Sequence, residues 1–310
     1  MRPQFPFLSP ATAMNSSIKY RVLSLLLLIF TGLTSVVKAD TLTIGSISGD
    51  ASKEIKSYKP LIEYLTRSLK SSGIDKIDIQ ITDGINQMTQ LMRSGSVDLY
   101  MDSPFPSLKL ANAGVSDVIL RRWKKGGEQY HSVIFVHSDS LIYSIEDLQG
   151  EMIGFEEGFS TSSYYLPKAS LQQKGLKLTS KIDRHETVAN DEIGYVFTGE
   201  DINTVTWVRK QRITAGAINN IKFDGLKDRF RKQLRIIFRS VSVPRQVVSY
   251  SKKIPPVLAK SLTQVLLNMD QTEYGKQQLK AFERTIKFDE FPDSVEKALT
   301  PMTELAEAFK

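Results

Sequence analysis

Short apolar stretches alternate with helical patterns along the first third of the chain, and this order constrains the fold more than any other feature. Residues 41–47, 76–82 and 97–101 are apolar or alternate with period two, as strands do. Residues 59–72 and 85–95 carry apolar side chains at helical spacing. This β-α-β-α-β order predicts a parallel sheet covered by helices.

A second set of the same kind follows without repeating the first sequence. Residues 131–139, 151–155, 193–197 and 213–218 are predicted strands, separated by helical patterns. The late segments LRIIFRS and RQVVSY are further predicted strands, and the chain ends in helical patterns. The sequence therefore predicts an α/β protein with two lobes, each a helix-covered and mostly parallel sheet.

The same reading gives expected domain boundaries. No low-complexity linker separates the two sets of elements. We expect residues 40–136 to form the first lobe, completed by residues 245–310, and residues 137–244 to form the second lobe.

The first 39 residues have the pattern of a cleaved secretory signal. Lys19 and Arg21 precede the apolar run 22–30, and small residues at 37 and 39 fit a signal-peptidase site. The run is shorter than the roughly 20 residues that a membrane span needs. We therefore expect residues 1–39 to be removed and the mature protein to reside in the periplasm.

Composition narrows the chemistry. Without residues 1–39, which hold four basic residues and no acidic ones, the net charge falls from +7 to +3, so nothing favours a nucleic-acid partner. The chain has no cysteine, which excludes disulfides and thiolate metal sites. With three histidines and no metal-binding motif, we expect neither metal nor cofactor.

The stretch GFSTSSYYLP, residues 158–167, places hydroxyl side chains where a helix is predicted to begin. Free backbone N–H groups and neighbouring hydroxyls at a helix start can hold an oxyanion, so Ser160, Thr161 and Ser162 are candidate ligand residues. The alternative is that one serine caps the helix and the others face solvent.

A second alternative is a serine hydrolase. The sequence Gly158-Phe159-Ser160-Thr161-Ser162 resembles the nucleophile elbow G-x-S-x-G except at its last position. His185 follows the serine in the chain, but without a distinctive context.

The chain resembles the periplasmic phosphonate/phosphite/phosphate-binding proteins of ABC importers over residues 41–292. STSSYYLP is similar to the family's oxyanion-binding motif S-T-S-G-[YF]-x-x-P, with Ser163 in place of glycine. Four further segments carry the resemblance: YKPLIEYL, SVDLYMDSP, SIEDLQGEMIGF and ITAGAINN. Three family positions differ, because a tyrosine, a histidine and an aspartate are replaced by Asp102, Glu200 and Thr214.

The resemblance implies a type II periplasmic binding protein, with closure about segments near 131–138 and 240–250. Such a protein is not an enzyme; it carries a small phosphorus oxyanion to an ABC permease, and we expect a monomer. The alternative partner is a periplasmic sensor domain. The expected ligand-binding residues are Ser160, Thr161, Ser162, Ser103, Asp102, Tyr58, Glu200, Thr214 and Asn219.

Overall fold

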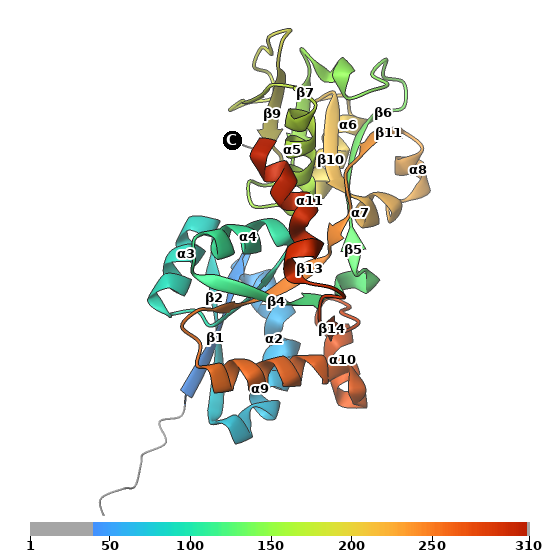
Figure 1. Cartoon of the computed structure of the whole chain (residues 1–310). Coiled ribbons are helices and arrows are strands. Elements are labelled where there is room, and N and C mark those ends of the chain that lie inside the picture. The colour runs from blue at the N-terminus through green and yellow to red at the C-terminus, as the bar shows by residue number, and fades with distance from the viewer. Residues whose placement is uncertain (1–39, 309–310) are drawn as a thin grey trace, which may run out of the picture. The chain divides into compact units, whose positions relative to one another are not determined.

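The computed structural model describes residues 40–308, and the predicted signal peptide, residues 1–39, lies outside this part. Within it the chain forms two six-stranded sheets and one two-stranded ladder, with helices on both faces of each large sheet (Figure 1). The predicted α/β fold with two helix-covered sheets is confirmed. Among the described residues, each helix is too short or too polar to traverse a bilayer.

The first sheet has the strand order β14-β4-β13-β3-β1-β2. Its strands are β1 (Asp40–Ile47), β2 (Ile74–Thr82), β3 (Leu99–Asp102), β4 (Ser116–Arg122), β13 (Gln246–Ser251) and β14 (Phe288–Asp289). Strands β1, β2 and β3 pair in parallel, as their helical crossovers require, whereas β13 is antiparallel to both β3 and β4. The sheet is therefore mixed, with a parallel part at the N-terminal strands.

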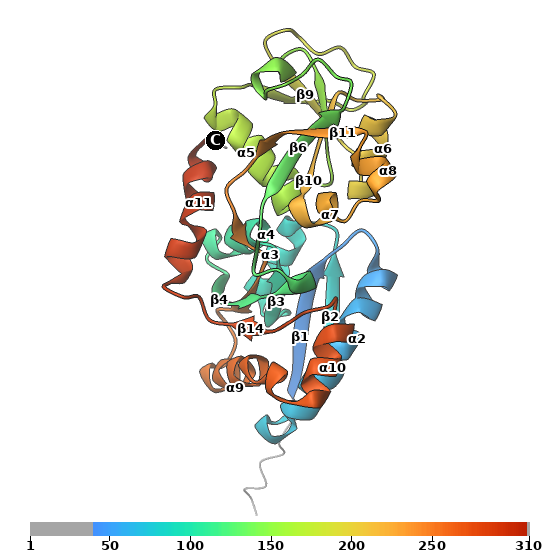
Figure 2. The ribbon, with the colours of Figure 1, turned by 90° about the vertical axis from the view of Figure 1, so that its right-hand side faces the viewer.

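Helices cover both faces of this sheet, as the two views show (Figures 1 and 2). The covering helices are α2 (Ala51–Ser68), α3 (Ile85–Ser94), α4 (Pro104–Asn112), α9 (Pro256–Leu267) and α10 (Glu273–Ala281). Leu99 and Met101 pack in one apolar core with α2, α9 and α10, whereas Tyr100 packs in another with α3 and α4. Because successive side chains of a strand point to opposite faces of the sheet, β3 contributes to both apolar cores.

The second sheet has the order β11-β6-β10-β7-β9-β8. Its strands are β6 (Ser132–His137), β7 (Met152–Phe155), β8 (Leu178–Ser180), β9 (Ile193–Phe197), β10 (Ala215–Asn219) and β11 (Leu234–Arg239). Strands β8, β9, β7 and β10 are parallel, and β6 is antiparallel to its two neighbours. The two sheets therefore share one plan, a parallel part followed by an antiparallel strand.

The second sheet is also covered on two faces. Its helices are α5 (Leu166–Gln173), α6 (Asp201–Arg209), α7 (Asn220–Asp224) and α8 (Asp228–Arg231). Ile134 and Val136 pack with Leu171 of α5, whereas Val133 and Phe135 pack in the core that includes residues of α6 and α7. Both sheets belong to the same compact unit of the chain.

Two short strands lie where the chain passes between the sheets. Strand β5 (Gln129–Tyr130) precedes β6, strand β12 (Val243–Pro244) follows β11, and the two pair in an antiparallel ladder. Strand β6 already belongs to the second sheet, so the lobe boundary expected at residue 136 falls inside a strand. We propose the passages through β5 and β12 as the boundaries instead.

The last helix departs from the expected division. Helix α11 (Val295–Ala308) packs beside α5, and the Tyr165 hydroxyl donates a hydrogen bond to the Met302 carbonyl at 2.8 Å. We therefore propose that α11, unlike the rest of residues 245–310, belongs with the second lobe. Its apolar residues, Met302 and Leu305, are buried in a core that contains Tyr165 and Leu166.

Strand β4 was not predicted, and the start of α2 was predicted too late, because both carry side chains that break the apolar pattern. Helix α2 begins at Ala51 instead of Lys59: Asp50 caps it by accepting from the Lys53 amide, but its first turns are largely exposed and include no apolar face. Strand β4 ends in Arg121 and Arg122, which are buried although charged. A buried arginine in a strand can be recognised only from its partners in the fold.

A fold-level prediction concerns Gly275 in α10. A Cβ at this position would lie 1.7 Å from the Met269 carbonyl oxygen, so the backbone would have to shift. We expect Gly275→Ala to lower the free energy of unfolding by about 3 kcal/mol or more, measured by urea denaturation. Gly84→Ala is the control, because nothing lies within 4 Å of a Cβ there. Equal stability of the two variants would contradict the packing described.

Candidate functional site

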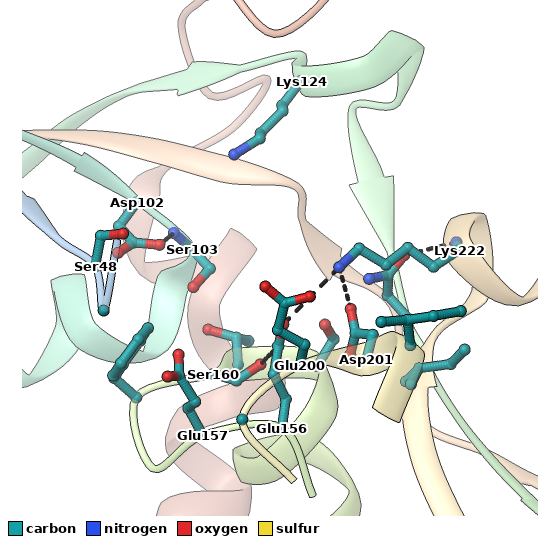
Figure 3. Close-up of a pocket in the computed structure, with 18 of the residues that line it drawn as sticks. Ser48, Asp102, Ser103, Lys124, Glu156, Glu157, Ser160, Glu200, Asp201 and Lys222 are labelled. Atoms are coloured by element: carbon teal, nitrogen blue, oxygen red, sulfur yellow. Dashed lines mark hydrogen bonds and ion pairs between the residues drawn. The ribbon is translucent and has the colours of Figure 1, made fainter. Parts of the chain in front are cut away.

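A cleft of about 840 Å³ lies where the carboxyl ends of parallel strands from both sheets meet the two passages between them. This is where open α/β sheets bind ligands, because helix starts and loops converge there. Seven of the nine expected ligand residues line it: Ser160, Thr161, Ser162, Ser103, Asp102, Glu200 and Asn219. Figure 3 shows Lys124 directed into the cleft from one side, with Ser160, Glu156 and Glu157 on the other.

The three hydroxyl residues Ser160–Ser162, here called the hydroxyl cluster, form the start of a helix after β7. The Ser160 side chain caps this helix by accepting from the Ser163 amide at 3.2 Å. The first turn, Thr161–Tyr165, is π-helical, with the Tyr165 amide donating to the Ser160 carbonyl. Widened turns of this kind are frequent at functional sites, and the first amides remain available to a ligand.

The hydroxyl cluster is connected to the first sheet. The Phe105 amide, at the start of α4, donates to the Thr161 hydroxyl oxygen at 2.8 Å. The Phe105 ring also stacks on Tyr165 with the ring centres 4.3 Å apart. Thr161 and Ser162 are both buried, and both line the cleft together with Tyr130 from the passage between the sheets. Elements from both sheets therefore fix the positions of these hydroxyls.

Asn219 is the second capping side chain in the cleft. Its side-chain oxygen accepts from the Lys222 amide at 2.9 Å and starts α7, which leaves the amide nitrogen as a donor toward the cleft. Asn219 is 4 % exposed. A capping asparagine at the end of β10 is therefore suited to present one N–H to an anion.

The carboxylates inside the cleft are held by the protein's own donors. Asp102 accepts from the Ser103 amide at 2.5 Å (Figure 3). It also accepts from the Tyr100 hydroxyl at 2.8 Å. Burial raises the pKa of Asp102, and these hydrogen bonds oppose the rise. Asp102 therefore does not depend on a ligand to satisfy its oxygens.

Lys222 neutralises a second acidic group. Its ammonium contacts Asp201 and lies 3.8 Å from Glu156 (Figure 3). The Ser163 hydroxyl donates to Asp201 at 2.7 Å. Burial and the neighbouring Asp201 raise the pKa of Glu156 to about 7, with Lys222 and Ser160 opposing. Ser163 thus binds Asp201, an acid of the cleft lining, although Ser163 itself does not line the cleft.

A third network lies on the side of the first sheet. The Arg122 guanidinium is fully buried, contacts Glu283 at 3.0 Å and Gln246 at 2.7 Å, and shares Glu283 with Lys124. Burial opposes ionisation of Glu283, but Lys124 and Arg122 outweigh it and lower its pKa to about 2. Glu283 is therefore ionised and fully engaged at neutral pH.

Comparisons with known proteins identify the family. A profile described as "ABC transporter, phosphonate, periplasmic substrate-binding protein" matches residues 44–295. The chain belongs to this family. Its members are periplasmic transport proteins that bind small ligands and work with ABC permeases, not enzymes.

Solved structures agree with this assignment. XAC2383 from Xanthomonas citri bound to chloride has 26% identity and a TM-score of 0.83, covering 87% of this chain and 98% of its own. The structure of XAC2383 bound to ATP has 25% identity and a TM-score of 0.80, over 87% and 99%. PhnD1 from Prochlorococcus marinus with methylphosphonate shares the fold at 17% identity and a TM-score of 0.66, over 88% and 99%.

Two expected ligand residues of this binding protein lie elsewhere. Tyr58 is 2 % exposed in the core of the first sheet, where its hydroxyl donates to the Met101 carbonyl and its ring contacts Phe282. Thr214 donates to Glu151 at the edge of a separate pocket. Tyr58 follows the helical core stripe and Thr214 precedes β10, at the opposite end of that strand from Asn219. Neither side chain reaches the cleft.

Sequence reasoning missed the cationic residues of the cleft. Lys124, Lys125, Lys222 and Arg245 line it, yet they come from separate passages and helix starts with no shared motif. The one local signal is the segment KKGG at residues 124–127, where Lys125 adopts a positive φ of 55°. Only the folded chain brings these side chains together.

The hydrolase alternative receives no geometric support. The Ser160 hydroxyl donates to Glu156 at 2.9 Å, whereas His185 is exposed and is not among the residues that line the cleft. The expected serine–histidine pair requires the histidine within hydrogen-bond distance of the serine, and the structure does not bring His185 to Ser160. Among the described residues, no cluster of three metal-ligating side chains is present either.

The raised pKa of Glu156 predicts pH-dependent stability. Between its ordinary pKa of 4.5 and about 7, the folded protein holds a proton that the unfolded chain releases, so this group lowers stability as pH rises through that window. We expect Glu156→Gln to reduce the loss of melting temperature between pH 5 and pH 8 relative to wild type. Glu200→Gln is the control, since Glu200 is exposed. Parallel curves for wild type and Glu156→Gln would contradict this prediction.

Proposed function

We propose that this binding protein carries a small phosphorus oxyanion, a phosphonate, phosphite or phosphate-like group, in the cleft between its two sheets. The single observation that carries the proposal is the hydroxyl cluster at the start of a helix, facing a cleft. The partial positive charge of the helix start and hydroxyl donors together favour an anion. The match to the phosphonate family supports the same chemistry.

The charges that line the cleft favour one small anionic group over an extended polyanion. Eight carboxylates and five cationic side chains line it. Asp102, Glu156, Asp201 and Glu283 have the partners described above, and Glu54 accepts a hydrogen bond from the Ser46 hydroxyl, whereas Asp50 and Glu200 are exposed at the cleft. Exposed carboxylates repel a second or third phosphate unless a cation accompanies it. We therefore propose a single phosphoryl head with an uncharged or cationic substituent.

A permease in the inner membrane is the proposed partner. Its docking would follow closure of the cleft about the passages through β5 and β12, as hinge closure does in this class of protein. The family match favours this transport role over docking to a sensor domain. The proposed protein is a monomer and breaks no bond in its ligand.

The proposal is tested by titrating wild-type protein with phosphate, phosphite, methylphosphonate and sulfate in a calorimeter. We expect at least one phosphorus anion to bind more tightly than sulfate. Ser162→Ala should then weaken binding about tenfold or more, because it removes a hydrogen bond to a charged group. Its melting temperature should stay near that of wild type, since the Ser162 side chain caps no helix.

Ser72→Ala is the matched control, because Ser72 is exposed in a turn remote from the cleft lining. Absence of binding by every phosphorus anion would refute the proposed function. If Ser162→Ala binds with unchanged affinity, the hydroxyl cluster is not part of the binding site. The combined replacement of Ser160, Thr161 and Ser162 by alanine should abolish binding, with some loss of stability because Ser160 is a cap.

A further inference from the structure

Arg245 is a buried arginine at the cleft. It lies between β12 and β13, in one of the two passages that join the sheets, and its amide donates to the Glu128 carbonyl at 2.7 Å. It is 8 % exposed, and the guanidinium carbon stacks 4.4 Å from the centre of the Tyr130 ring. Arg245 is also part of the cleft lining. The backbone and the ring thus hold this cation beside the cleft.

The Arg245 guanidinium has no acceptor within residues 40–308. Its Nε is shielded from solvent and makes no hydrogen bond, and no carboxylate pairs with it. The neighbouring cations differ, because Arg122 and Lys124 share Glu283 and Lys222 contacts Asp201. A buried charge without a partner is strongly unfavourable, so the position indicates a partner outside the chain.

The surroundings of Arg245 are positive. Burial lowers the pKa of Lys124 to about 8, and the charges of Arg122 and Arg245 add to that effect against the attraction of Glu283. Burial also lowers the pKa of Lys125, which has no ion-pair partner among the described residues. Arg245 and Lys125 are therefore two uncompensated positive charges on one cleft wall.

Tyr130 links these cations to the hydroxyl cluster. Burial raises the pKa of Tyr130, whereas the Arg245 charge and hydrogen bonds with Ser162 and Thr161 oppose the rise. The Arg245 guanidinium lies over the Tyr130 ring, and both residues line the same cleft as Thr161 and Ser162.

We propose that Arg245 is the charged ligand-binding residue of this site, and that it selects a doubly charged phosphoryl group over singly charged anions. The planar guanidinium donates to two oxygens of the group, while the Ser162 hydroxyl donates to another. Lys125 supplies the second positive charge. A dianion balances both cations, whereas a sulfonate leaves one of them uncompensated. This inference rests on the proposed function.

The test uses methylphosphonate and methanesulfonate, two ligands of similar shape and different charge, at pH 8, where a phosphoryl group carries close to two charges. Calorimetry should show methylphosphonate binding to wild type at least about tenfold more tightly than methanesulfonate. Arg245→Gln should weaken methylphosphonate binding about 30-fold or more and remove most of this preference. The affinity of Arg245→Lys for methylphosphonate should lie between those of wild type and Arg245→Gln, because lysine keeps the positive charge but cannot donate two parallel hydrogen bonds.

The ligand-free protein supplies a second readout that separates a binding role from a structural one. Without ligand, Arg245→Gln should melt at the temperature of wild type or above, because it removes an unpaired buried charge. A structural arginine would lower the melting temperature when replaced. Arg239→Gln is the control, since Arg239 is exposed at the end of β11 and does not line the cleft; it should leave affinity unchanged.

The outcomes separate the two proposals. If wild type binds no phosphorus anion, the proposed function fails and the role of Arg245 fails with it. If wild type binds and Arg245→Gln binds equally well, or if its ligand-free form melts several degrees lower, only the role of Arg245 is overturned. Equal affinity of wild type for both ligands would overturn the selection for a dianion.

Discussion

The short ladder between β5 and β12 is the constraint on which the rest of the site depends. It pairs Tyr130 with Val243 where the chain passes from one sheet to the other and back. The same pairing sets Arg245 over the Tyr130 ring and Tyr130 against the hydroxyls of Thr161 and Ser162. Two residues on each strand thus join both sheets and the start of a helix at one point. If the cleft closes about this ladder, as proposed, these residues stay together during closure.

Charge in the cleft is arranged by pairing. Counted as ionised groups, its lining is acidic, which by itself argues against an anion. Three of the interior acids already have partners, which reduces their repulsion of the proposed anion. Asp102 is held by Tyr100 and Ser103, Asp201 by Lys222 and Ser163, and Glu283 by Arg122 and Lys124. Among the described residues, Lys125 and Arg245 of the cleft lining remain without an ion-pair partner. The proposed anion site therefore depends on which individual groups are paired, since the summed charge of the lining residues is negative.

Much of the fold could be predicted from the sequence, and the exceptions share one cause. Strands such as β1 and β7 have apolar side chains on both faces, so their pattern is visible in the chain. Strand β4 was missed because Arg121 and Arg122 are buried with Asp289 and Glu283 as partners, and these partners lie more than 150 residues away. The start of α2 was missed because a capped, exposed helix end carries no apolar stripe. When a buried charge in a strand is compensated by residues far away in the sequence, the local hydrophobic pattern does not reveal the strand.

The sequence by itself determined the family, the alternation of strands and helices, and the hydroxyl cluster, because each of these is written in neighbouring residues. Tertiary structure alone decided which other side chains meet that cluster. It excluded Tyr58 and Thr214, whose places in a core and at the far end of β10 follow from packing and strand direction. It added Lys125 and Arg245, which are 120 positions apart and meet because two passages pair as strands. Binding chemistry depends on distance in space, and the chain order does not record it.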